Sequence, residues 1–186
     1  MAVSSTPPLP LPRIDVCSRV LIIIVSFFTG AALATAIVGL LTQYWYYSQD
    51  SNGNILYHNL FTQCSGNIRN GSSTCLDIQR DNDLGVSTLY AAAFLIVAIC
   101  LIGCAMFVTL AMNCVLLTGT LLFVAPILLF LAAGFMIALF AITSRVTIFN
   151  GYSVILVQTS HGLTILSLGL IAFASGRLHT YYYERY

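Results

Sequence analysis

The sequence predicts a membrane protein: an all-α bundle of four transmembrane helices that carries a small extracellular antiparallel β-sheet. Three observations lead to this fold class. Hydrophobic residues make up 59% of the 186 positions and charged residues 7%, with a mean hydropathy of +0.92, which is more apolar surface than one water-soluble core can bury. Four apolar runs are each long enough to cross ~30 Å of hydrocarbon. One polar stretch of about forty residues separates the first two runs and contains β-type sequence.

The four apolar runs are predicted as transmembrane helices at residues 20–42, 86–112, 115–143 and 154–175. Uniformly apolar segments have no period that separates helix from strand, so the assignment depends on length, because a barrel strand needs only about ten residues and alternates polar with apolar side chains. The first run is interpreted as a retained span and not as a signal peptide, since it begins only at position 20 and lacks a clear small-residue cleavage site.

An even number of spans places both tails, residues 1–19 and 176–186, on one side of the membrane. The second and third spans are joined by a short turn at 113–114, and the third and fourth by a loop at 144–153. Four arginines lie near the spans on the side of the tails and three on the other side, so the positive-inside rule alone does not orient the chain.

The orientation follows from the long loop at residues 43–85. Cys64 and Cys75 are its only cysteines, and a sequon for N-glycosylation at Asn70 lies between them. Disulfides persist and glycans are added on the lumenal or extracellular side, so the loop is predicted to lie outside the cell, with both tails in the cytoplasm. A disulfide that closes about a dozen residues restricts the unfolded chain by roughly 2 to 3 kcal/mol. The alternative is two free thiols and an unused sequon.

The same loop is predicted to form the antiparallel sheet. The segments YWYYSQ, ILYHNLFTQC and STCLDI are rich in aromatic and β-branched residues, and DSNGN between the first two contains an Asn-Gly pair suited to a tight hairpin turn. Three or more strands docked on the bundle are more stable than an isolated hairpin, and a disulfide would hold neighbouring strands together.

These residues resemble the outer-loop signature of the claudin, peripheral myelin protein and calcium-channel gamma-subunit superfamily. That signature is a Trp soon after the first span, then Gly-Leu-Trp, two residues, Cys, about eight to ten residues and a second Cys. The chain has Trp45, then Asn59-Leu60-Phe61, then Cys64 and Cys75 at the matching spacing. It departs from the signature in having Asn59 for Gly and Phe61 for Trp.

Two further features bear on the branch of this superfamily. The stretch from Gly151 to Ser153, with Leu156, is similar to the start of the last span in the myelin-protein branch, although Gln158 stands where that branch tends to have Trp. The outer loops are shorter than those of junctional claudins, and the chain ends in YYYERY instead of the Tyr-Val that claudins offer to PDZ scaffolds.

The resemblance implies a claudin-like protein of the plasma membrane that acts in cell-cell adhesion, junctions or a paracellular barrier. It would pack beside copies of itself in the bilayer and meet a partner on the adjacent cell. In claudins, charges near the second cysteine bias ion selectivity, and Asp77, Asp81 and Asp83 occupy that region here, which predicts a preference for cations. The alternative for these residues is a solvated acidic edge.

A second function is open: an auxiliary subunit of the gamma type, which changes the gating or trafficking of an ion channel or receptor. The short loops and the absence of a Tyr-Val end favour it. No redox pair, metal-ligand spacing, phosphate loop or arrangement of nucleophile and base is recognisable in the sequence, so we expect no enzyme, cofactor or metal. A near-neutral charge balance of seven basic and six acidic residues predicts no nucleic-acid partner.

Residues in or beside the predicted spans complete the expectations. Cys17 and Cys114 lie at the cytoplasmic membrane boundary, where reversible palmitoylation occurs. His161, the one ionisable residue inside a span, is expected to form an interhelical hydrogen bond, with a proton relay as the alternative. Pro126 is expected to bend the third helix, and the runs GAALATA, LAAG and LGLIAFASG are expected to let helices approach closely.

Overall fold

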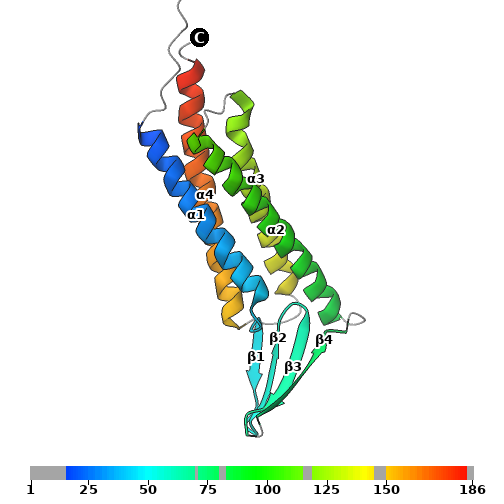
Figure 1. The fold of residues 1–186 in the computed structure, drawn as a ribbon. Coiled ribbons are helices and arrows are strands. Elements are labelled where there is room, and N and C mark those ends of the chain that lie inside the picture. Colours follow the sequence, from blue (N-terminus) through cyan, green and yellow to red (C-terminus); the bar gives the residue numbers. More distant parts are fainter. Residues whose placement is uncertain (1–15, 70, 80–82, 115–118, 145–149, 184–186) are drawn as a thin grey trace, which may run out of the picture.

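The computed structural model describes residues 16–69, 71–79, 83–114, 119–144 and 150–183. It contains four long α-helices, with a four-stranded antiparallel sheet between the first and second of them (Figure 1). The elements in chain order are α1 (Val16–Leu41), β1 (Tyr46–Gln49), β2 (Asn54–His58), β3 (Thr62–Asn67), β4 (Ser72–Asp77), α2 (Asp83–Cys114), the 3₁₀ segment η1 (Gly119–Phe123), α3 (Val124–Thr143) and α4 (Tyr152–Tyr183). The predicted architecture, a four-helix bundle with a small antiparallel sheet, is therefore confirmed.

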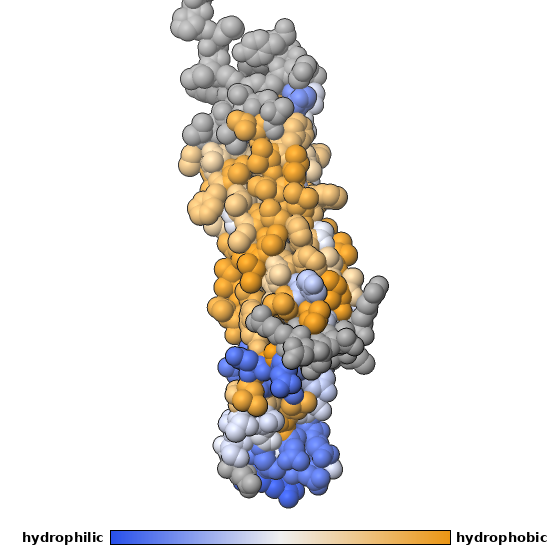
Figure 2. Space-filling view, turned by 90° about the vertical axis from the view of Figure 1, so that its right-hand side faces the viewer, coloured by the Kyte–Doolittle hydropathy of each residue, from blue (hydrophilic) through white to orange (hydrophobic). Residues whose placement is uncertain are grey.

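All four helices are long and apolar enough to cross a membrane, over Val16–Leu41, Val86–Cys114, Leu121–Thr143 and Tyr152–Thr180. Only 28% to 39% of the residues in the most apolar part of each span are buried inside the bundle, so most apolar side chains face outward. Figure 2 shows the result as an apolar surface along the bundle, with hydrophilic residues gathered at the sheet end. A surface of this kind is stable in hydrocarbon, and the chain is a multi-pass membrane protein.

The helices pack as two antiparallel neighbours, α1 along α4 and α2 along α3, and these pairs close into one bundle (Figure 1). In the first pair, buried positions alternate in steps of four and three residues. On α1 they are Ser18, Ile22, Val25, Thr29, Ala32, Ala36 and Gly39. On α4 they include Ser153, Val157, Ser160, Thr164, Ser167, Ile171, Ala174 and Leu178. A mean step of 3.5 residues is the pattern of left-handed coiled-coil packing.

Hydropathy does not separate the buried seam from the outward face, since Ile22 is fully buried and Ile23 beside it is 54% exposed. Ala32 and Ala36 are fully buried, whereas Phe27 is 73% exposed on the same helix. Gly39 is required by close approach, because a Cβ there would lie 2.6 Å from Cγ2 of Val157. Within the predicted run GAALATA, residues 30–36, Ala32 and Ala36 are fully buried, and Gly39 lies three residues beyond that run. In the last run the expected close approach is not found at Gly169, whose Cβ would meet no atom within 4 Å.

Pro126 lies in the first turn of α3 and not in the middle of the helix. The expected bend is therefore replaced by a change from 3₁₀ to α geometry just before Pro126. A proline has no N–H, and Pro126 therefore cannot donate to the carbonyl of Leu122 four residues earlier. That oxygen instead accepts a hydrogen bond of 2.8 Å from Oγ of Ser175 on α4. The proline thus leaves an acceptor that ties α4 to the start of α3.

The sheet has the strand order β1-β2-β3-β4, with every neighbouring pair antiparallel. The predicted Asn-Gly turn is present, and Gly53 adopts a φ of 83° that favours glycine. The predicted strand segment at 55–64 is two strands, because Oδ1 of Asn59 accepts hydrogen bonds from the N–H groups of Phe61 (2.7 Å) and Thr62 (2.6 Å). This turn of the Asx type reverses the chain toward β3.

Candidate functional site

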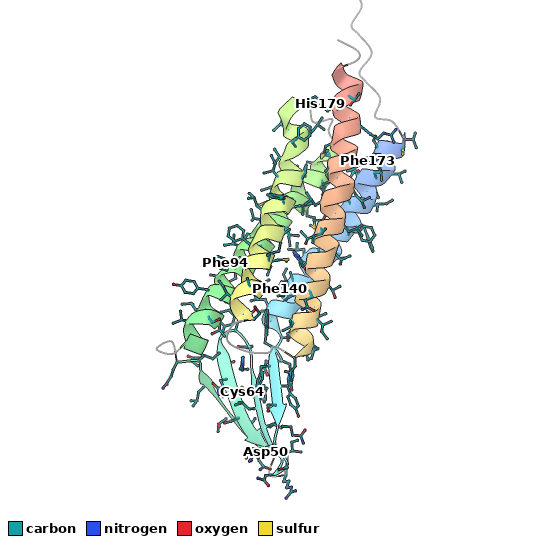
Figure 3. The ribbon with its side chains drawn as sticks, turned by 180° about the vertical axis from the view of Figure 1, so that it is seen from behind. Asp50, Cys64, Phe94, Phe140, Phe173 and His179 are labelled. Atoms are coloured by element: carbon teal, nitrogen blue, oxygen red, sulfur yellow. A yellow bond between two sulfur atoms is a disulfide. The ribbon has the colours of Figure 1, made fainter. Side chains whose placement is uncertain are left out.

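The sheet stands at the end of the bundle where α1 ends and where α2 and α4 begin, and its strands project away along the long axis (Figure 1). In Figure 3, Cys64 lies in the middle of the sheet and Asp50 at its far tip. Among the described residues, the sheet presents a polar surface with a definite shape. We therefore build the candidate site from the residues that attach the sheet, bridge it and form its faces.

Trp45 attaches the sheet to the bundle. Its side chain is fully buried, and its indole Nε1 donates a hydrogen bond of 3.0 Å to the carbonyl of Gly39. Gly39 lies in the last turn of α1, where carbonyl groups have no partner within the helix. Leu60, also buried, belongs to the same cluster of core residues as Trp45, whereas Phe61 beside it is 43% exposed. Two of the three motif residues are thus anchors, and Phe61 remains at the surface.

The segment that precedes α4 closes the outer edge of β1. Asn150 reaches the backbone of Tyr47 with both ends of its amide: Oδ1 accepts from the Tyr47 N–H (2.9 Å), and Nδ2 donates to the Tyr47 carbonyl (2.8 Å). The N–H of Gly151 donates to the carbonyl of Trp45 (3.1 Å), and that of Ser153 to the carbonyl of Tyr44 (3.3 Å). The second loop therefore pairs with the first as a short extra strand would.

Cys64 and Cys75 form the predicted disulfide. They are directly opposite each other on β3 and β4, with 4.0 Å between their Cα atoms. Cys64 is buried and Cys75 is exposed, so the bridge connects the inner part of the sheet to its outermost strand. It holds β4 in register with β3.

One face of the sheet is hollowed and carries mostly uncharged polar groups, with Asp50 in the lining of one hollow and Asp77 in that of the other. Two shallow hollows of about 460 and 540 Å³ share the side chains of Ser65 and Thr74. Leu56 and Leu76 add apolar surface. Such a surface suits hydrogen bonding and contact with another macromolecule, and the described residues contain no group of His, Cys, Asp and Glu side chains that would hold a metal ion.

His58 lies at the base of the sheet, where it is almost fully buried and stacks on Tyr46 at 5.1 Å between ring centroids. Its Nδ1 is 3.2 Å from the carbonyl of Asn59. Burial lowers the pKa of His58 below its ordinary value, since desolvation disfavours the charged ring, and the contact with Asn59 opposes this shift. The neutral imidazole is therefore the form that the folded sheet favours.

The acidic residues predicted for ion selectivity are placed only in part. Asp77 ends β4 and is exposed, Asp83 begins α2, and Asp81 lies outside the described residues. The predicted glycosylation site Asn70 also lies outside them. The exposed carboxylate of Asp77 therefore sits between the sheet and the bundle, at the base of the hollowed face.

The cysteines at the terminal end of the bundle have exposed side chains. Cys17 lies in the first turn of α1, where Nη1 of Arg177 donates to its Sγ at 3.3 Å, and Cys114 is the last residue of α2. His161, within α4, meets Phe140 edge-on at 5.9 Å. Its Nδ1 is buried and finds no hydrogen-bond partner among the described residues, so the expected interhelical bond is not seen at this atom.

Two residues of the site were not singled out by the sequence as structural contacts. In the sequence Asn59 is a departure from the family motif, and in the structure it organises the turn between β2 and β3. Asn150 pairs with a residue 103 positions away. An Asn-Gly pair before a helix is a local signal for a turn, but no local signal identifies the distant partner.

Comparison with known protein families and with curated proteins gives no match.

Proposed function

We propose that the protein is a claudin-like adhesion or barrier protein of the plasma membrane, and that the sheet is its recognition surface outside the cell. The observation that carries this proposal is the rigid attachment of the sheet. Trp45 binds it to α1, Asn150 and Gly151 bind it to the start of α4, and the Cys64–Cys75 bridge holds its outer strand. A pre-organised surface loses little conformational entropy on binding, which favours recognition of a partner.

The disulfide supports the orientation, because such bonds persist outside the cytosol. The sheet then faces the exterior, and both termini lie in the cytoplasm. A labelling experiment tests this topology, since the chain contains no lysine. A reagent that is specific for amines and cannot cross membranes should label Asn52→Lys, at the exposed tip of the sheet, on intact cells. The matched variant Thr180→Lys, exposed on the last turns of α4, should be labelled only after permeabilisation. The reverse pattern would exclude the proposed orientation.

Adhesion is tested by mixing two populations of non-adherent cells that express the protein with different fluorescent tags. We expect mixed aggregates, and we expect them to be lost in the double variant Cys64→Ser, Cys75→Ser, which frees β4 from β3. A variant without the exposed thiol of Cys104 on α2, Cys104→Ser, is the control and should aggregate like the parent protein. Cells that stay dispersed despite surface delivery would contradict the adhesive role.

A preference for cations rests on charge. The loop at residues 43–85 contains four aspartates and two arginines, which leaves two net negative charges, and Asp77 exposes its carboxylate. Negative charge at a narrow passage enriches cations. In a leaky epithelial monolayer, expression should shift the dilution potential toward cation selectivity, and Asp77→Asn together with Asp81→Asn and Asp83→Asn should remove the shift. An unchanged potential would count against a pore role.

A second function, as an auxiliary subunit of a channel or receptor, is favoured by the outward face of α4. Gln158 is exposed on a membrane span and makes no hydrogen bond with any described residue. In hydrocarbon an amide without a partner is costly, and another membrane helix can supply one. Gly162, Gly169 and Gly176 have no atom within 4 Å of a built Cβ, so a helix can approach closely there.

Native purification separates the two functions. An auxiliary subunit should carry channel or receptor subunits in fixed ratio, and Gln158→Leu should weaken that association. Thr159→Val is the matched control, because the hydroxyl of Thr159 already donates to the carbonyl of Ile155 (2.8 Å). Enrichment at cell contacts with copies of itself alone would favour adhesion.

A further inference from the structure

The two edges of the sheet are treated differently by the rest of the chain. At the β1 edge, Asn150 satisfies the outward N–H and carbonyl of Tyr47, and Gly151 satisfies the outward carbonyl of Trp45. At the β4 edge, all six residues are exposed. No residue in the described ranges donates to or accepts from the outward backbone groups of β4.

The register identifies these outward groups. The N–H of Ile78 donates to the carbonyl of Phe61 (3.0 Å), which makes 61 and 78 a hydrogen-bonded pair of the antiparallel ladder. Because hydrogen-bonded pairs alternate along such a ladder, Leu76, Thr74 and Ser72 also direct their backbone groups toward β3. The residues between them, at positions 73, 75 and 77, direct theirs away from the sheet. The 4.0 Å between the Cα atoms of Cys64 and Cys75 agrees, since pairs without ladder hydrogen bonds lie closest.

The edge has little of the usual protection. Natural edge strands carry charged residues, above all lysine, or proline or a bulge that prevents pairing with another chain, and the one charge on β4 is Asp77 at its end. The strand Ser72–Asp77 has the sequence SSTCLD and keeps a regular register with β3 over its full length. It also exposes 75% of Leu76. A regular edge with so little protection is a surface to which another strand can add.

We propose that this edge binds the β4 strand of a second copy in antiparallel orientation, so that one sheet continues across both molecules. The proposal rests on the adhesive function proposed above and names its contact. Two identical antiparallel edges are related by a two-fold axis and are self-complementary. With Cys75 opposite its equivalent, the outward groups of Ser73 meet those of Asp77 in the other copy, and the Ser73 hydroxyl can donate to that carboxylate. In the same register Leu76 lies against Thr74 of the second copy.

The direction of β4 determines whether the second copy lies in the same membrane or in a facing membrane. β4 runs from the tip of the sheet back toward α2, and the strands follow the long axis of the bundle (Figure 1). Antiparallel pairing therefore puts the two bundles at opposite ends of the joined sheet, as in two apposed membranes. Copies side by side in one membrane would have parallel β4 strands. A six-residue edge binds weakly alone, so many copies on facing membranes must act together.

Cross-linking between cells tests the register. One cell population carries Thr74→Cys and the other Leu76→Cys, each with its own tag, and the mixture is treated with a mild oxidant. Positions 74 and 76 are opposite each other across the proposed interface, so we expect roughly fivefold more cross-linked dimer from this mixture than from Thr74→Cys on both populations. Gln49→Cys on both populations, on β1 at the opposite edge of the sheet from β4, is the control and should give none.

A proline variant tests the backbone contact independently. The N–H of Ser73 points outward, so Ser73→Pro removes a donor that the sheet itself does not use and should reduce cross-linking between cells at least tenfold, to background. Gln49→Pro is the matched control, since that N–H points outward from β1, and it should leave cross-linking unchanged. Emission of the buried Trp45 and formation of the Cys64–Cys75 bridge confirm that each variant folds.

The outcomes separate this contact from the general function. Aggregation of cells without cross-links between positions 74 and 76 would overturn the edge pairing and leave adhesion intact. Cross-links found only within one population would overturn the pairing between membranes. Absence of both aggregation and cross-links would overturn the two proposals together.

Discussion

Gly151 offers the sharpest test of how the sheet is held. A Cβ at this position would overlap the carbonyl oxygen of Tyr44, and it would lie 2.5 Å from the carbonyl carbon of Tyr44 and 2.9 Å from that of Trp45. All three atoms belong to the backbone, so no side-chain rotation relieves the overlap. Gly151→Ala must separate the start of α4 from the residues before β1.

The expected loss follows from the contacts at this junction. The hydrogen bonds from Gly151 to Trp45 (3.1 Å) and from Ser153 to Tyr44 (3.3 Å) would break, at about 1 kcal/mol each, and the packing of Trp45 would loosen. We therefore expect Gly151→Ala to destabilise attachment of the sheet by about 2 to 4 kcal/mol.

The single tryptophan of the chain is the reporter, because Trp45 is fully buried only while the sheet is attached. In a urea titration of the protein in lipid nanodiscs, its emission should shift to the red at a clearly lower denaturant concentration in Gly151→Ala. Gly134→Ala is the control: Gly134 on α3 has no atom within 4 Å of a built Cβ, and alanine there should be neutral or stabilising by up to about 1 kcal/mol. Equal midpoints and equal emission for Gly151→Ala and the parent protein would refute the steric reasoning.

Three further predictions use the same titration. Because the folded sheet favours neutral His58, its stability should be complete above pH 6.5, the ordinary pKa of histidine, and should fall as the pH decreases below it, whereas His58→Phe should lose most of this dependence. Ser175→Ala should cost about 1 to 2 kcal/mol by leaving a buried carbonyl without its donor, and that cost should shrink in a Pro126→Ala background, where the helix can supply the missing N–H; equal costs in both backgrounds would contradict the account. Asn150→Ala should weaken attachment of β1 by about 1 kcal/mol, and Asn150→Asp by more, because the carboxylate keeps the acceptor for the Tyr47 N–H but sets an oxygen with no proton against the Tyr47 carbonyl; a smaller effect of the aspartate than of the alanine would argue against the paired geometry.

The fold was largely predictable because its main signals are local. Length and apolar composition identify four helices, aromatic and β-branched residues around an Asn-Gly pair identify the sheet, and two cysteines in one loop identify the bridge. The errors have a common origin. The apolar run predicts Pro126 inside a helix, whereas α3 begins just before it, and the residues at 55–64 are predicted as one strand segment, whereas Asn59 turns the chain there. At both places a side chain bonds to the backbone, Asn59 within its own turn and Ser175 from the distant α4, and the apolar pattern of the sequence does not display these contacts.

The sequence by itself determined that the helices lie in lipid, how many spans there are, and that the sheet stands between the first two helices. The length of an apolar run and the residues of a turn act within short stretches of chain, so they can be recognised without the fold. Only the tertiary structure decided which face of each uniformly apolar helix is buried, since residues of one type, such as Ile22 and Ile23, lie on both faces and hydropathy does not distinguish them. It also decided that Asn150 covers one edge of the sheet while β4 keeps the other open. Those contacts join residues far apart in the chain, and the geometry that brings them together exists only after the bundle has formed.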